Sequence, residues 1–230
     1  MEITWLGHST FQMKLLTGEV IVFDPWVKEN PSFPKNFEFE KIDFLLLSHG
    51  HFDHTDDAVR LAKKFKPKVI SIFELSTWLG KQGVGDLHPM NKGGTQALSP
   101  LEITMTHALH SSSVMDGNDI VYAGEPCGYV VKLPEGRRFY FAGDTAVFGD
   151  MALIRELYEP ELAFLPIGSL FTMGPHEAAK AVQLLGVSKV VPMHYGSLPV
   201  LTGTPAEFTS KVAGYETTVL TMQPGQTIHW

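Results

Sequence analysis

The stretch that decides the fold is residues 43–54, which read DFLLLSHGHFDH. Its first part, Asp43–Leu47, is an apolar run of the kind expected for a strand buried on both faces. The strand leads directly into a turn with four side chains of metal-ligand type, His49, His51, Asp53 and His54. Groups of this kind at this density are costly to hold together unless a cation offsets them, so the stretch predicts a metal site at the end of a buried strand.

A polar surface loop that carries histidines by chance is the alternative interpretation, and for one isolated histidine it would be preferred. Here the spacing of the histidines disfavours a surface loop. His49 and His51 are two residues apart, so both rings can project to the same side of the turn, and Asp53 and His54 can turn toward a nearby point. Zinc-type ions take imidazole nitrogen and carboxylate oxygen at ~2.0–2.2 Å, which suits such a cluster.

The composition restricts the chemistry to these ligand types. Ten histidines stand against a single cysteine, Cys127, which excludes a disulfide framework and a thiolate-based structural zinc site. The 230 residues carry 18 Lys and Arg against 25 Asp and Glu, a formal net charge of −7, which disfavours nucleic acid as a partner. We find no signal peptide and no apolar run near the ~20 residues of a membrane helix, so we expect a cytoplasmic protein without an integral membrane segment.

Three further residues of ligand type each follow a predicted strand and lie near glycine or serine. They are His110 after Leu101–Thr106, Asp144 after Arg138–Phe141, and His194 after Val187–Pro192. Because the loops after such strands gather at one edge of the sheets, we expect these residues to join the first four. Seven ligands are too many for one tetrahedral ion but suit two ions that share Asp144. His107 is the alternative to His110, but it falls where the strand is expected to end.

The rest of the chain alternates strands and helices in both halves. Short strands are predicted at Ile3–Leu6, Phe11–Leu16 and Val20–Phe23, and a helix with proline in its first turn at Pro175–Leu185. Each half runs from an apolar strand to a turn of ligand type and on to a helix, and no linker separates them. The sequence therefore predicts a single α/β domain over residues 1–230, a four-layer αββα sandwich.

The ligand order and several short motifs resemble the metallo-β-lactamase superfamily, and within it the UPF0173 metal-dependent hydrolase group. That group is related to the ascorbate-lactone hydrolases and to N-acyl phosphatidylethanolamine phospholipase D. The resemblance spans nearly the whole chain. The motifs are WLGHSTF at residues 5–11, DPW at 24–26, SHGHFDH at 48–54, MNKGG at 90–94, AGDT at 142–145 and PMHYG at 192–196.

The resemblance implies the αββα metallo-β-lactamase fold and a site for two metal ions. It places His49, His51 and His110 on the first ion and Asp53, His54 and His194 on the second, with Asp144 between them. Zinc is the favoured metal, with manganese or iron as alternatives. The second position of the motif is a histidine, where the diiron oxygen-reducing relatives typically carry glutamate, which favours hydrolysis over redox chemistry.

We therefore expect a hydroxide bridging two ions to cleave an ester, lactone, amide or phosphodiester bond of a small-molecule substrate. Asp53 and His54 are the expected catalytic residues, with Asp53 orienting the hydroxide and accepting its proton. Two alternatives stay open: a phosphodiesterase specifically, or a non-catalytic metal-binding protein on the same fold. The sequence also leaves open whether the chain forms a homo-oligomer.

Two more residues are candidates for contact with the substrate or with a metal ligand. His8 lies in a turn between two strands, where a histidine satisfied by the backbone is the alternative. Asp24 follows a strand and is a candidate carboxylate for the N–H of a metal-bound histidine, with a surface turn aspartate as the alternative. We interpret His176 as an exposed residue in the first turn of a helix.

Overall fold

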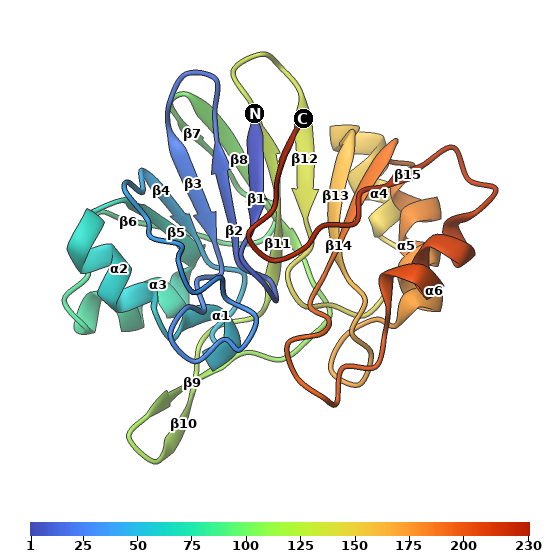
Figure 1. Ribbon diagram of the computed structural model, residues 1–230. Coiled ribbons are helices and arrows are strands. Elements are labelled where there is room, and N and C mark those ends of the chain that lie inside the picture. The colour runs from blue at the N-terminus through green and yellow to red at the C-terminus, as the bar shows by residue number, and fades with distance from the viewer. The chain divides into compact units, whose positions relative to one another are not determined.

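The computed structural model describes residues 1–230 and divides into two compact units. Unit 1 comprises Met1–Asn91, Ser111–Glu125 and Met222–Trp230, and unit 2 comprises Lys92–His110 and Pro126–Thr221. Each unit contains one seven-stranded sheet and its own helices (Figure 1). That residues 1–230 form a single domain stays a prediction.

The sheet of unit 1 has the order β16-β1-β2-β3-β4-β5-β6. Its strands are β1 (Glu2–Trp5), β2 (Phe11–Lys14), β3 (Val20–Phe23), β4 (Phe44–Leu46), β5 (Lys68–Ile72), β6 (Leu87–Met90) and β16 (Thr227–His229). β16, β1, β2 and β3 pair antiparallel, whereas β3, β4, β5 and β6 pair parallel. Because parallel strands end at the same edge, the residues after β3 and after β4 emerge side by side, with Phe23 opposite Leu46.

Three helices and a hairpin complete unit 1. The helices are α1 (Phe52–Thr55), α2 (Ala58–Phe65) and α3 (Phe73–Lys81), and α3 packs against β5 and β6. The hairpin of β9 (Ser113–Asp116) and β10 (Asp119–Tyr122) forms a separate two-stranded sheet that projects from the unit (Figure 1). Neither α1 nor this hairpin is predicted from the sequence.

The sheet of unit 2 has the order β15-β14-β13-β12-β11-β8-β7. Its strands are β7 (Thr95–Leu98), β8 (Leu101–His107), β11 (Cys127–Lys132), β12 (Arg138–Phe141), β13 (Leu162–Pro166), β14 (Lys189–Met193) and β15 (Thr218–Val219). β12 to β15 pair parallel, and β11 and β12 form an antiparallel hairpin. The ends of β12, β13 and β14 therefore lie at one edge of this sheet.

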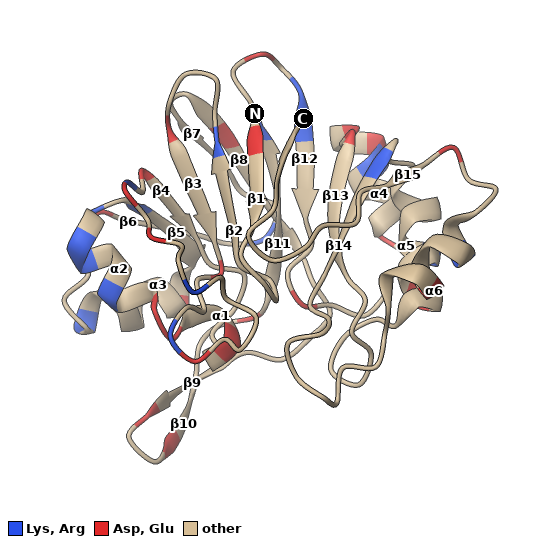
Figure 2. Cartoon of the chain, in the orientation of Figure 1, with Lys and Arg blue, Asp and Glu red and all other residues tan.

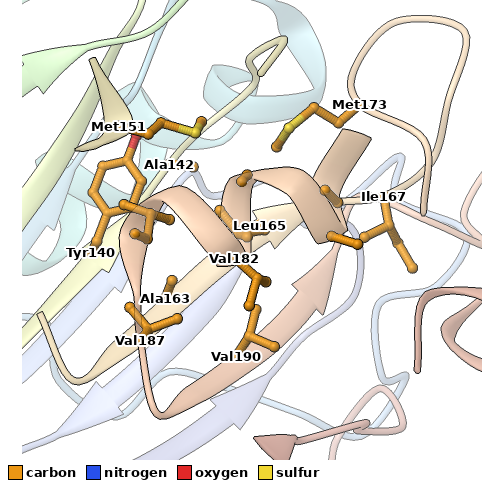
Figure 3. Close-up of a cluster of buried hydrophobic side chains, with 14 of the residues drawn as sticks. Tyr140, Ala142, Met151, Ala163, Leu165, Ile167, Met173, Val182, Val187 and Val190 are labelled. Carbon is orange, nitrogen blue, oxygen red and sulfur yellow. The ribbon is translucent and has the colours of Figure 1, made fainter. Parts of the chain in front are cut away.

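The helices of unit 2 are α4 (Met151–Tyr158), α5 (Pro175–Leu185) and α6 (Pro205–Val212). The α5 helix has the predicted bounds and ends at Gly186, whose φ of 61° lies in the left-handed region that glycine tolerates. Its buried face meets the parallel strands in a cluster of aliphatic side chains, where Val182 lies near Leu165 and Val190 (Figure 3). This packing fixes the parallel strands whose ends carry two of the predicted ligands.

Charged side chains are unevenly placed in unit 1. Basic residues gather on α2, and acidic residues gather at α1 and in the turn that follows it (Figure 2). None of the helices of the chain has both the length and the apolar character that crossing a membrane requires.

Candidate metal centre

In unit 1 the four predicted ligands come together at the end of β4. His49 Nε2 lies 3.0 Å from His51 Nδ1, and the ring centroids of His49 and His54 are 4.2 Å apart. The single turn of α1 carries Asp53 and His54, with His54 Nε2 3.9 Å from Asp53 Oδ2. His49 and His54 are fully buried, whereas His51 and Asp53 keep partial exposure. The structure thus brings all four side chains of this stretch together.

Gly50 is required for this close arrangement. A Cβ atom at this position would lie 2.6 Å from the Cβ of Ala123 and 2.9 Å from the carbonyl oxygen of Ser113. The Thr55 hydroxyl lies 3.0 Å from the carbonyl oxygens of Gly50 and of His51 and so secures the turn from the other side. The glycine between the first two histidines therefore serves packing, and the ligand residues on either side depend on it.

Asp24 lies behind the ligand stretch and is fully buried. Its Oδ2 atom accepts hydrogen bonds from the Ser48 hydroxyl at 2.6 Å and from His54 Nδ1 at 2.8 Å, and its Oδ1 atom accepts one from the Ser48 backbone N–H at 2.7 Å. The alternative of a surface turn aspartate is therefore wrong. Because His54 Nδ1 is bonded to this carboxylate, the other ring nitrogen, Nε2, remains for a metal ion.

His8 is also buried and contacts the ligand stretch through Asp53, with 3.0 Å between His8 Nε2 and Asp53 Oδ2. Its carbonyl oxygen accepts a hydrogen bond from Trp5 Nε1 at 2.9 Å, and its ring packs edge-on against Trp26 and His54. The residue is therefore held by its own backbone as well as by its ring. Its position supports contact with a candidate ligand rather than a purely local turn role.

In unit 2 the three predicted ligands also meet. Asp144 Oδ2 lies 3.0 Å from His194 Nε2 and 3.7 Å from His110 Nε2. Asp144 and His194 are almost fully buried and follow the ends of β12 and β14, the two strands that flank β13, whereas His110 keeps 13% exposure of its side chain. A single carboxylate oxygen is thus near both imidazoles.

Backbone contacts hold these three residues in place. The Leu109 N–H donates to Thr145 Oγ1 at 3.0 Å, and the Ala146 N–H donates to the Leu109 carbonyl oxygen at 3.0 Å, which joins the His110 loop to the turn after β12. A Cβ atom on Gly168 would lie 2.0 Å from the carbonyl oxygen of His194, so only glycine fits there.

Three of the residues in the two clusters adopt a left-handed backbone conformation, with φ of 55° at His8, 42° at Asp24 and 56° at His194. Such conformations cost on the order of 1–3 kcal/mol for side chains with a Cβ and persist where the surrounding structure determines them, often at functional sites.

The remaining histidines lie apart from these contacts. His107 is the last residue of β8, with its Nδ1 3.1 Å from Lys92 Nζ and its ring against Phe148. Of the two candidates, His110 is the one brought to Asp144. His176 is exposed in the first turn of α5, as interpreted from the sequence.

The donor atoms fit divalent transition-metal ions. Two ligand atoms of a tetrahedral ion with bonds of ~2.0–2.1 Å are about 3.3 Å apart, close to the 3.0 Å between the ring nitrogens of His49 and His51. Imidazole with carboxylate is a donor set that zinc, manganese and iron all accept.

The charge around α1 also favours a cation. Partial burial, followed by the negative charges of Asp57, Asp53 and Glu29, raises the pKa of Asp56. Burial alone would raise the pKa without any neighbouring charge, but the contributions of the three carboxylates show that they make the local potential more negative. The acidic residues seen at α1 in Figure 2 thus attract positive ions to the ligand stretch.

Sequence reasoning missed Ser48 and Gly168. The sequence gives a weak indication for Ser48: it lies between an apolar strand and a ligand histidine, and a polar side chain buried there needs a hydrogen-bond partner. Gly168 gives no such signal, because its role depends on a contact with a strand end far along the chain.

Comparison with known proteins agrees with the fold and with a metal-dependent hydrolase. The family model described as "Beta-lactamase superfamily domain" matches residues 20–195. A protein of Solibacter usitatus described as a UPF0173 metal-dependent hydrolase is 54% identical over 230 residues, which is 100% of both chains. A protein of Koribacter versatilis with the same family description is 47% identical and covers 99% of this chain and 97% of its own.

A solved structure shares the fold of this chain along almost its whole length. Igni18, described as a metallo hydrolase of the archaeon Ignicoccus hospitalis, superposes with a TM-score of 0.87 at 35% identity, over 99% of this chain and 97% of its own. The predicted metallo-β-lactamase fold and the family resemblance are confirmed. The chain belongs to the UPF0173 metal-dependent hydrolases of the metallo-β-lactamase superfamily.

Proposed function

We propose that this metal-dependent hydrolase cleaves an ester, lactone, amide or phosphodiester bond with two divalent ions held by seven side chains. The first ion would be held by His49, His51 and His110, and the second by Asp53, His54 and His194. Asp144 would contribute to both. Zinc is the ion that this donor set favours, and manganese and iron are the alternatives.

The position of Asp144 is the observation that carries the proposal. Its Oδ2 atom lies within 3.7 Å of His110, assigned to the first ion, and within 3.0 Å of His194, assigned to the second. A carboxylate oxygen beside one ligand of each ion is what a bridging ligand requires.

When bound, such a pair of ions would lower the pKa of a water molecule and polarise the bond to be cleaved. The protein's own side chains would position the reactants and accept the proton. The side chain of Asp53 is 14% exposed, so it can reach water and substrate, whereas the side chain of His54 is fully buried and would act as a metal ligand. Asp53 Oδ2 would therefore orient the attacking water and take up its proton, with His8 Nε2 at 3.0 Å holding the carboxylate.

Metal content and turnover measured together test the proposal. We expect elemental analysis of the purified protein to find about two transition-metal ions per chain. The metal-loaded protein, reconstituted in parallel with zinc, manganese and iron, is then assayed against a panel of esters, lactones, amides and phosphodiesters, and we expect turnover of at least one class.

The outcomes separate the alternatives. No metal after purification and no uptake on reconstitution would contradict the ligand assignment. Two bound ions without turnover across the panel would contradict hydrolysis and favour a metal-binding protein without catalysis. Turnover confined to phosphodiesters would narrow the function to a phosphodiesterase.

A further inference from the structure

Ser48 connects two parts of the ligand cluster of unit 1. Its hydroxyl oxygen lies 2.6 Å from Asp24 Oδ2 and 3.0 Å from His49 Nδ1, and the residue is 1% exposed. Asp24 Oδ2 in turn lies 2.8 Å from His54 Nδ1. One buried carboxylate oxygen is thus joined directly to His54 and, through one hydroxyl, to His49.

The number of protons in this chain of contacts fixes their direction. An ionised carboxylate only accepts hydrogen bonds, and a serine hydroxyl has a single proton to donate. The short contact of 2.6 Å with Asp24 therefore uses the Ser48 proton. Toward His49 the hydroxyl can offer only a lone pair, so His49 Nδ1 must donate. A neutral imidazole has one N–H, and His49 Nε2 is then the nitrogen with the free electron pair.

The same count applies to His54. Its Nδ1 atom faces a carboxylate oxygen and must donate to it, which leaves the electron pair on Nε2. His51 differs, because it presents Nδ1 rather than Nε2 toward His49. His54 therefore donates to Asp24 directly, and His49 donates to Ser48, which donates to the same Asp24 oxygen.

We propose that Ser48 is a positioning residue for His49. By donating its proton to Asp24, the Ser48 hydroxyl can only accept a hydrogen bond from His49. This keeps the His49 proton on Nδ1 and leaves His49 Nε2 to bind a metal ion. Ser48 lies between Asp24 and His49, whereas Asp24 contacts His54 directly and reaches His49 through Ser48. Assigning these two histidines to different ions rests on the proposed function.

This difference predicts unequal effects of two substitutions. Ser48→Ala removes the link to His49 alone and should weaken binding of the ion held by His49, while the ion held by His54 keeps its affinity. Asp24→Asn places a carboxamide beside both links and should weaken binding of both ions. Loss of a hydrogen-bond partner behind a metal ligand typically costs about 10–100-fold in metal affinity.

Nuclear magnetic resonance tests the tautomers without metal and without turnover. Long-range ¹H–¹⁵N spectra of metal-free protein labelled at histidine distinguish Nδ1–H from Nε2–H rings. We expect the Nδ1–H form for His49 and His54 in the native chain. In Ser48→Ala the His49 signals should move toward those of a mixture of the two tautomers, while the His54 signals stay unchanged. The separate variant Ser48→Thr keeps the hydroxyl and should show the native His49 signals.

Ser76→Ala is the matched control. Ser76 in α3 is another buried serine of unit 1, and its hydroxyl lies 2.7 Å from that of Ser71, outside the ligand cluster. This variant removes a buried hydroxyl at comparable structural cost and should leave both tautomers unchanged. Titration with zinc in competition with a chromophoric chelator then measures each affinity, with a loss of about 10–100-fold for one ion in Ser48→Ala and none in Ser76→Ala.

Three results would overturn the proposal: an Nε2–H ring at His49 in the native chain, a Ser48→Ala variant with unchanged His49 signals, or equal loss of both ions in Ser48→Ala. The spectra also keep this test separate from that of the proposed function. A chain that binds ions but hydrolyses nothing can still show the predicted tautomers, and a hydrolytic chain can fail to show them.

Discussion

Unit 1 and unit 2 hold their candidate ligands by different means. In unit 1 four ligand residues fall within one short stretch, and buried side chains behind it, Asp24, Ser48 and His8, fix their rings and carboxylate. In unit 2 the ligands come from three separate strand ends, and main-chain contacts hold them: the parallel ends of β12 and β14, and the approach of Gly168 to His194.

The comparison teaches where each cluster is vulnerable. The cluster of unit 1 should respond to changes in side-chain hydrogen bonding, with the fold preserved. The cluster of unit 2 should respond to changes in the backbone, because its side chains point correctly only when the strand ends are in register. Substitutions that separate loss of function from loss of stability can test this difference.

Asp53→Ala should have the largest effect on activity. It removes the group that we propose to accept the proton, and general-base groups contribute on the order of 10²–10⁴-fold to turnover. The free energy of unfolding of the metal-free protein should change little, since Asp53 is partly exposed and the lost contact with His8 is offset by relief of the repulsion between Asp53 and Asp56. The measurement is kcat on any substrate found in the panel, together with urea unfolding.

His176→Ala is the control for this substitution. His176 is exposed at the start of α5 and should retain activity within about twofold. Equal losses of turnover in the two variants would contradict the role assigned to Asp53.

Gly168→Ala should have the largest effect on stability. Its new Cβ would lie 2.0 Å from the His194 carbonyl oxygen, so the chain after β13 or after β14 must shift. Overpacking of this kind costs about 1–3 kcal/mol, and the shift would also displace His194 from Asp144. Denaturant unfolding and metal titration should therefore both show losses.

Gly149→Ala, in the same unit, provides the comparison, because no atom lies within 4 Å of a Cβ built there. We expect this variant to unfold like the native chain. Loss of metal binding in Gly168→Ala without any loss of stability would contradict the view that the backbone holds the ligands of unit 2.

The two units also differ in how much the sequence revealed. The apolar strands and the long amphipathic helix were predictable, and β3 and α5 have the expected bounds. The edge strands β6 and β7 were missed because they are half-exposed and read LHPM and TQAL, without clear alternation. The four residues of α1 are too few to show a helical period.

For the candidate site, the sequence predicted which residues gather within each unit, because residue type and position after a strand are local properties. It could not predict the contacts that hold them. The bond from Ser48 to Asp24 joins the ends of two parallel strands, and the approach of Gly168 to His194 joins two strand ends of unit 2. Both depend on sheet register, which the sequence indicates only weakly.

Alkaline pH should destabilise the chain through Tyr195, the neighbour of His194. Burial raises the pKa of Tyr195 from 10.0 to about 12. Between these values the unfolded chain releases the phenolic proton while the folded chain retains it, so the free energy of unfolding falls as pH rises. Tyr195→Phe should reduce this slope, measured by denaturant unfolding from pH 9 to about pH 12. Tyr122→Phe, at an exposed position, should keep the native slope.

The smallest expected effect is that of Asp56→Asn in unit 1. Because partial burial and the charges of Asp57, Asp53 and Glu29 raise the pKa of Asp56, the folded chain binds this proton more tightly than the unfolded chain does. The stability that the protonated form confers is present at low pH and is lost as pH rises through the folded pKa, so ionised Asp56 weakens the fold at neutral pH. Asp56→Asn should therefore raise the free energy of unfolding of metal-free protein at pH 7, by less than about 0.5 kcal/mol, because the side chain remains accessible enough for solvent to screen these charges. The gain should vanish near pH 3.

The gain from Asp56→Asn should also shrink when divalent ions are added at pH 7, because their charge offsets that of Asp53. A gain of the same size with and without ions would mean that the repulsion at α1 does not involve the ligand stretch, and the negative charge there would then serve some purpose other than attracting a cation.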